Sequence, residues 1–179
     1  LLKVVEPDSL ATETLPLADA SGGSIDGQSG TVYFSRFGLQ LTGDNTKVYR
    51  GGAMGELWSW QLGSTNEARR LSAEHKGSIS QPVFYQGRVY FVSDADGNSN
   101  IWSVAADGTD ATQHSFHKNW RIGRISVANE QVLYQLGADL QLLNLKSGDS
   151  RTLPLQIQSD LVQRRERIIS KPLQYFTSA

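Results

Sequence analysis

The sequence predicts an all-β protein, and more narrowly a β-propeller fragment of about three and a half four-stranded blades. Short runs of β-branched and aromatic residues, each flanked by Gly, Asp, Asn or Ser, predict strands throughout. These runs recur in units of roughly 40 residues, the spacing of propeller blades. Before residue 155 no stretch sustains the i, i+3, i+4, i+7 apolar pattern of a helix.

The first elements predict half a blade over residues 1–16 and a long blade over about 17–72. Leu2–Val5 reads as a strand that returns through 11–14. In the long blade, Val32–Ser35 and Leu57–Trp60 predict strands, and 68–71 predicts the return strand. An insert from Gly38 to Glu56, rich in Gly and polar residues, lengthens this blade relative to its neighbours.

Two regular blades follow, at about 77–115 and 118–154. The first contains strands at Gln81–Phe84, Val89–Ser93 and Ile101–Val104, with a return at 111–114. The second repeats that order at Arg124–Val127, Val132–Tyr134, Leu140–Leu143 and 150–153. Residues 155–179 form a connector in which basic residues gather; it is either a solvated link to a next blade or a face for an acidic partner. Because one thin blade cannot bury both faces alone, apolar strand residues are expected to pack blade against blade.

The composition excludes several classes of function. The formal net charge is −1, which argues against a nucleic-acid partner. No apolar run reaches the roughly 20 residues of a membrane helix, so no membrane partner is expected. The absence of Cys excludes disulfides and thiolate metal sites; it fits a cytoplasmic location and is also compatible with the periplasm. The first residue is Leu, so we expect a piece of a longer protein.

Besides the tryptophans, three patterns could carry chemistry; we favour a structural interpretation for the first two, and the third has two open interpretations. His114 and His117 lack a Gly-x-Ser-x-Gly elbow for a serine triad, so packing or capping is expected. Alternating Asp94, Asp96, Asn98 and Asn100 lack the spacing and the Glu of an EF-hand, and predict a hairpin rather than a metal site. The Gly51–Gly55 run precedes a strand and lacks the Lys-Ser/Thr ending of a phosphate loop, so it is either a loop bordering a channel or a plain blade-edge loop.

The four tryptophans divide into two kinds. Trp58 and Trp102 occupy the same place in their repeats, as blade-to-blade packing would produce, and Trp60 lies on the same strand as Trp58. Trp120, followed by Arg121, falls on a link between blades and is the better candidate for an exposed contact.

Some of these residues resemble the first propeller of tricorn proteases. The resemblance starts at Tyr49-Arg50-Gly51-Gly52 and Gly55-Glu56-Leu57-Trp58, and continues through residues 87–94, 96–103, 107–110, 113–114 and 137–140 to the connector at 159–167. It covers most of the chain and is densest from Tyr49 to Leu153.

The resemblance implies a six-bladed propeller and a parent enzyme that is a serine peptidase acting on short peptides. The first propeller of such enzymes is thought to channel peptides or products, while the serine, the histidine and the oxyanion hole lie far downstream. It further implies other domains in the same polypeptide and a hexameric assembly. This chain would then hold no catalytic residues, and we expect no cofactor and no metal.

One departure from the family concerns peptide anchoring. Archaeal members carry two arginines, just after an Asp-Gly turn, that hold the C-terminal carboxylate of the substrate. Here Asp26-Gly27 is followed by Gln28-Ser29-Gly30, so both arginines are missing, and Arg36 and Arg50 are nearby candidates to replace them.

Our candidate residues for contact with peptides in passage are therefore Arg36, Tyr49, Arg50, Trp120 and Arg121. The alternative function is a propeller that acts only as a binding scaffold, similar to the periplasmic Tol-system propeller. A third alternative is the propeller of a prolyl-oligopeptidase-type enzyme. The residues that flank this segment in the full protein would distinguish the three.

Overall fold

A computed structural model describes residues 2–37, 48–71, 73–156, 166 and 168–171, and in this part of the chain every regular element is a strand. The N-terminal hairpin pairs β1 (Lys3–Val5) with β2 (Thr12–Thr14). Its strands are the pair predicted for the half blade. Most of the connector and residues 38–47 of the insert lie outside the described residues.

Three four-stranded antiparallel sheets follow, each built from strands that are adjacent in the sequence. The first contains β3 (Ala20–Asp26), β4 (Thr31–Arg36), β5 (Glu56–Gln61) and β6 (Arg69–Arg70). The second contains β7 (Ile79–Tyr85), β8 (Arg88–Ser93), β9 (Asn100–Ala105) and β10 (Thr112–Gln113). The third contains β11 (Ile122–Ala128), β12 (Gln131–Leu136), β13 (Asp139–Asn144) and β14 (Ser150–Leu153).

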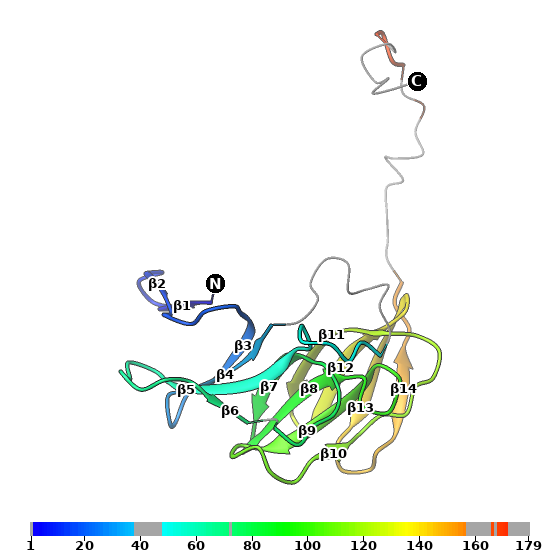
Figure 1. The fold of residues 1–179 in the computed structure, drawn as a ribbon. Helices are drawn as coiled ribbons and strands as arrows, with labels where there is room; N and C mark the ends of the chain where they lie inside the picture. Colours follow the sequence, from blue (N-terminus) through cyan, green and yellow to red (C-terminus); the bar gives the residue numbers. More distant parts are fainter. Residues whose placement is uncertain (1, 38–47, 72, 157–165, 167, 172–179) are drawn as a thin grey trace.

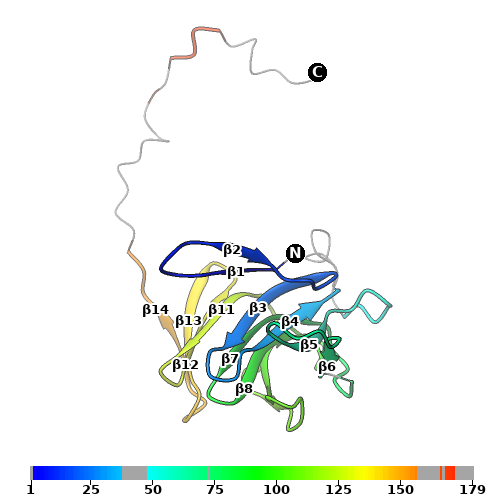
Figure 2. The same ribbon diagram turned by 90° about the vertical axis from the view of Figure 1, so that its left-hand side faces the viewer.

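The sheets stand side by side as consecutive blades, with their first strands together (Figures 1 and 2). β3 lies against β7, and β7 lies against β11. We call β3, β7 and β11, the first strands of the three sheets, the inner strands. One hydrogen bond joins β3 and β7 directly: the Phe84 amide donates to Ser24 Oγ at 3.0 Å. The prediction of an all-β propeller fragment is therefore confirmed.

Apolar side chains fill the space between neighbouring sheets, as the blade argument requires. Between the first and second sheets, Tyr33 stacks on Phe84 with ring centroids 5.2 Å apart. The buried residues around this pair are Leu57, Leu71, Ile79, Val89, Phe91 and Val104. A second group lies between the second and third sheets and comprises Val92, Ile101, Ile122, Val132, Tyr134 and Leu143.

The tryptophans take part in this packing. Trp58 faces Phe34 in the β4–β5 register, and Trp102 faces Phe91 in the β8–β9 register, so both occupy the same place in their blades. Trp60 is buried in the cluster on the outer side of the first sheet, against Leu15 and Leu17. The packing role predicted for these three residues is confirmed.

Candidate functional site at the ends of the inner strands

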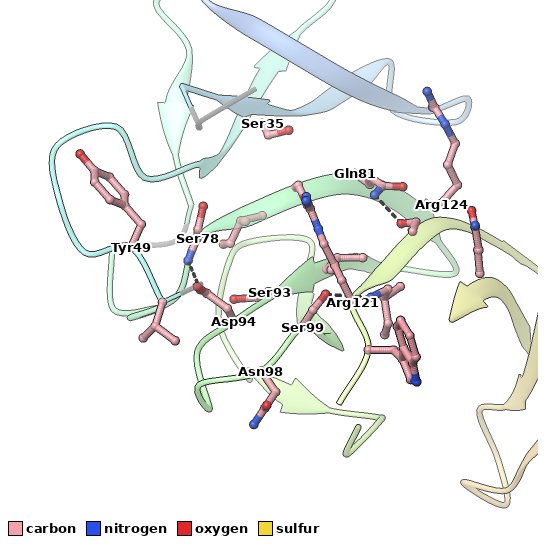
Figure 3. Close-up of a pocket in the computed structure, with 18 of the residues that line it drawn as sticks. Ser35, Tyr49, Ser78, Gln81, Ser93, Asp94, Asn98, Ser99, Arg121 and Arg124 are labelled. Carbon is pink, nitrogen blue, oxygen red and sulfur yellow. Dashed lines mark hydrogen bonds between the residues drawn. The ribbon is translucent and has the colours of Figure 1, made fainter. Parts of the chain in front are cut away.

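A cavity of about 870 Å³ opens where the inner strands of the three sheets come together. Its walls come from the start of β3, the end of β4, the start of β7, the end of β8, and the 118–124 link into β11. All three blades therefore contribute to one space (Figure 3). Its volume lies in the range typical of ligand sites.

Each of the three inner strands, β3, β7 and β11, has a shift in its pairing register beside this cavity. The register shifts between Ser21 and Gly23 in β3, between Ser80 and Val83 in β7, and between Ile122 and Ile125 in β11. Gly22, Gln81 and Arg124 lie within these shifts, and all three line the cavity. Gly22 and Gln81 adopt positive φ values of 50° and 55°. Bulges are known to re-aim side chains next to functional sites.

Gln81 ties two blades together at this level. Its Nε2 donates to the carbonyl oxygen of Gly123 at 2.6 Å, and its Oε1 accepts from the amide of Ile125 at 3.2 Å. These two backbone groups flank Arg124 on either side. The side-chain amide thus satisfies the polar backbone that the bulge in β11 releases from its ladder.

One wall of the cavity is a polar contact between the insert and the second sheet. Arg50 Nη1 lies 3.2 and 3.1 Å from the two carboxylate oxygens of Asp94, and its Nη2 donates to the Asp94 carbonyl at 2.9 Å. Asp94 Oδ1 also accepts from the amide of Ser78 at 2.8 Å. Arg50 is therefore engaged with a carboxylate of its own chain.

Three of the five predicted contact residues line the cavity: Tyr49, Trp120 and Arg121. Trp120 is 68% exposed, and its ring lies against Gly137 in the β12–β13 turn. A Cβ at Gly137, where φ is +62°, would lie 3.3 Å from the ring. The absence of a side chain at Gly137 therefore allows the indole of Trp120 to pack closely against the turn. An exposed indole beside a cavity can stack on apolar or cationic groups.

Arg36 lies elsewhere. Its guanidinium carbon is 4.7 Å from the ring centroids of both Phe37 and Trp58, and the cavity lining does not include it. Arg36 shares a face of β4 with Phe34, the side that packs in the outer cluster of the first sheet. The structure does not bring Arg36 together with Tyr49, Trp120 and Arg121.

Lys118 and Arg124 also line the cavity, and sequence reasoning did not select them. Arg124 stands at the start of a predicted strand, where alternation alone cannot reveal a bulge. Arg124 would have been selected only by aligning the three inner strands, so that Gly22, Gln81 and Arg124 occupy equivalent positions.

The three histidines bind hydroxyl groups rather than forming a triad. His75 Nε2 lies 2.7 Å from Ser93 Oγ, His114 Nε2 lies 2.8 Å from Ser103 Oγ, and His117 Nε2 lies 2.9 Å from the Tyr134 hydroxyl. Ser93 and Ser103 are buried. Burial is the main cause that lowers the pKa of each imidazole below 6.5. At His75, Asp94 opposes this shift and Arg50 adds to it.

The Asp94–Asn100 segment forms the predicted hairpin between β8 and β9. Asp96 Oδ2 accepts from Asn100 Nδ2 at 2.9 Å and from Gln113 Nε2 at 2.7 Å, and its Oδ1 accepts from the Asn98 amide at 3.0 Å. These carboxylate oxygens are held by donors of the protein. Across the residues that the structure describes, no three His, Asp or Glu side chains gather closely enough to hold a metal ion.

Asn100, which the sequence placed only in the hairpin pattern, also has a structural role beyond that hairpin. Its side chain is fully buried, donates to the His117 carbonyl, and accepts from the Ser115 hydroxyl and the His117 amide. It therefore fixes the link that carries the chain from the second sheet to the third, and with it the start of the 118–124 wall.

The fold and the shared cavity define an arc of a β-propeller with a polar and aromatic space at one end of its inner strands. The chain belongs to the family described as the tricorn protease N-terminal β-propeller domain, whose model matches residues 1–149.

Its relatives include the putative tricorn protease homolog 2 of Streptomyces coelicolor, 31% identical over 158 residues, or 84% of this chain and 12% of that protein. The tricorn protease of Thermoplasma volcanium is 25% identical over 128 residues, 72% of this chain and 12% of that protein. The chain thus spans about an eighth of the length of these relatives.

Solved structures agree on the fold. The crystal structure of the tricorn protease matches with a TM-score of 0.69 at 22% identity, over 88% of this chain and 15% of that one. A putative TolB from Agrobacterium tumefaciens matches with a TM-score of 0.59 at 14% identity, over 78% of this chain and 50% of that one. The described residues contain no helix long and apolar enough to cross a membrane.

Proposed function

We propose that this chain is a non-catalytic part of the first propeller in a tricorn-like serine peptidase, and that its cavity borders a passage for short peptides. Residues 1–179 would form one continuous part of that propeller, completed by blades from the rest of the polypeptide. The observation that carries the proposal is the cavity shared by the three inner strands, with Tyr49, Trp120 and Arg121 in its walls. We also propose that the parent enzyme is located in the cytoplasm and assembles as a hexamer.

The hydrogen bonding of the histidines supports a non-catalytic role. A serine nucleophile must reach a substrate carbonyl while bonded to its histidine. Ser93 is bonded to His75 and Ser103 to His114; Ser103 is fully buried, and Ser93 borders the cavity but is only 2% exposed. Hydrolysis would then depend on residues elsewhere in the full-length protein.

Peptide contact is proposed for Tyr49, Trp120 and Arg121. The ring of Trp120 offers a broad face to a passing chain, and Arg121 supplies hydrogen-bond donors. Arg50 binds Asp94, which lines the cavity. Its predicted role as an anchor for the substrate carboxylate would therefore require the Arg50–Asp94 contact to break. We do not propose Arg36 as a residue that contacts peptides in this cavity, because its guanidinium stacks on Trp58.

The experiment compares substrates of different length in the full-length enzyme carrying Trp120→Ala or Tyr49→Ala. If peptides pass this cavity, kcat/KM for longer peptides changes by about threefold or more, while that for dipeptide-sized reporters stays constant. The control is Phe116→Ala, an aromatic residue that is 71% exposed and lies outside the cavity lining.

Equal changes for both substrate lengths, or no change in either, would contradict the passage. Full-length protein that binds a partner through this face and hydrolyses no peptide would instead favour the scaffold alternative.

A further inference from the structure

The charged residues of the cavity are unbalanced. Among the described residues that line it, three are cationic, Lys118, Arg121 and Arg124, and one is anionic, Asp94. The chain as a whole has a net charge of −1, so this excess of positive charge is local. A concave surface lined by charges of one sign focuses the electrostatic field.

The Asp94 carboxylate does not neutralise Lys118 or Arg124, because it is already occupied by other groups. Arg50 binds both oxygens of Asp94, and the Ser78 amide donates to one of them. Arg50 is not one of the three cationic residues that line the cavity. Its positive charge offsets the negative charge of Asp94, so the charges of the lining cations are not offset by Asp94. Figure 3 shows Asp94 on the Ser78 side of the cavity, away from Arg124.

Lys118 and Arg124 make no hydrogen bond or ion pair within the described part of the chain. Both side chains are exposed. The backbone on both sides of Arg124 is held, because Gln81 bonds the carbonyl before it and the amide after it. A cation whose backbone is held rigid loses less entropy when it binds an anion than one on a loose loop.

The aromatic side chains set the kind of anion that fits. Trp120 and Tyr49 border the same space as the cations. Inorganic ions would leave these rings unused, whereas a peptide can place its backbone and apolar atoms on the rings and its carboxylates on Lys118 and Arg124.

We propose that the cavity selects acidic peptides, by binding the side-chain carboxylates of Asp and Glu residues through Lys118 and Arg124. This inference rests on the proposed passage of peptides and names the class of peptide that passage favours. Because the attraction acts largely between exposed charges, it raises the rate of entry more than the affinity and weakens as salt is added.

The test uses full-length enzyme and peptides of one length and one cleavage site, acetylated at the N-terminus and amidated at the C-terminus. Three versions carry Glu, Gln or Lys at positions distant from the cleaved bond. In the unmodified enzyme, kcat/KM for the Glu peptide should exceed that for the Gln peptide by about threefold to tenfold, with the Lys peptide slowest. The preference should shrink as NaCl is raised.

Lys118→Gln combined with Arg124→Gln should abolish the preference, and Lys76→Gln should retain it. Lys76 is also an exposed lysine, but it is not part of the cavity lining. Equal rates for Glu and Gln peptides in the unmodified enzyme, or a preference that survives the double substitution, would overturn the proposal.

Two further arms separate the possible causes. Gln peptides with a free C-terminus test whether the recognised carboxylate is the chain terminus, and a preference confined to them would overturn the assignment to side chains. Trp120→Ala tests the passage itself. A length-dependent effect of Trp120→Ala without any charge preference refutes only the acidic class, while the absence of both effects refutes the passage as well.

Discussion

Arg50 and Asp94 are 44 positions apart, yet the guanidinium of Arg50 binds both carboxylate oxygens and the backbone carbonyl of Asp94. Arg50 belongs to the insert of the first blade, and Asp94 to the turn after β8 in the second. The pair therefore fastens the described end of the insert to the neighbouring blade and shapes one wall of the cavity.

This pair predicts unequal costs for its two partners. Asp94→Ala should lower the free energy of local opening around 48–56 and 76–80 by about 1–3 kcal/mol, because the Ser78 amide also loses its acceptor. Arg50→Ala should cost less, about 1 kcal/mol or below, since the pair is partly exposed. Hydrogen exchange of these segments in the full-length protein measures both losses; a larger loss for Arg50→Ala would contradict the assignment.

The amide of Gln81 predicts a second effect, on the joint between the second and third blades. Gln81→Leu keeps much of the side-chain volume but removes the donor to Gly123 and the acceptor for Ile125, so we expect about 1–3 kcal/mol of destabilisation. Thermal unfolding of the full-length protein and hydrogen exchange at 122–128 measure this loss. The control is Gln141→Leu, whose amide bonds Thr152 on an exposed surface; matching losses from both variants would show that Gln81 is not a special contact.

Asn100 predicts the largest single effect on the link between these blades. Asn100→Ala should destabilise the 115–122 segment by about 2–4 kcal/mol, because four hydrogen bonds are lost in a buried site. Asn98→Ala serves as the comparison, since Asn98 bonds Asp96 through its backbone amide. Protection of the Ser115–His117 amides that is unaffected by Asn100→Ala would refute this role.

The histidines predict a loss of stability in mild acid. Burial lowers their pKa values in the folded state below the 6.5 of an accessible imidazole, so the unfolded chain takes up protons first as the pH falls. Stability should be complete above about pH 6.5 and should decrease below it. Unfolding midpoints between about pH 7.5 and 5.5 measure the slope, which His117→Gln should flatten; a midpoint that rises on acidification would contradict the direction of the shifts.

Much of the fold could be predicted from local pattern. Strands such as β4, β8 and β13 are dense in β-branched, aromatic or Leu residues, and their turns carry Gly with Asp or Ser. The equal placement of Trp58 and Trp102 followed from aligning the repeats. β3 was not identified because its sequence, Ala-Ser-Gly-Gly-Ser-Ile-Asp, has the composition of a loop, and it forms a strand through pairing with β4.

The candidate site was less accessible to sequence reasoning. Trp120 and Arg121 could be selected because they fall on a link between blades. Arg36 and Arg50 were selected for their charge, but partners distant in sequence decide their environment: Arg50 meets Asp94, and Arg36 meets Trp58. The position of Arg124 depends on a bulge and on Gln81 from another blade, and neither leaves a mark in the sequence near residue 124.

The proposal that peptides pass through the cavity is tested most directly by attaching a bulky group that narrows the cavity. The chain contains no Cys, so Tyr49→Cys in a full-length enzyme without other reactive cysteines can be labelled with a bulky maleimide at the cavity. We expect labelling to reduce kcat/KM for longer peptides at least about tenfold while dipeptide reporters are still cleaved, and a label at Glu74→Cys, outside the lining, to change neither. Undiminished cleavage of long peptides by the fully labelled enzyme would contradict the proposal that they pass here.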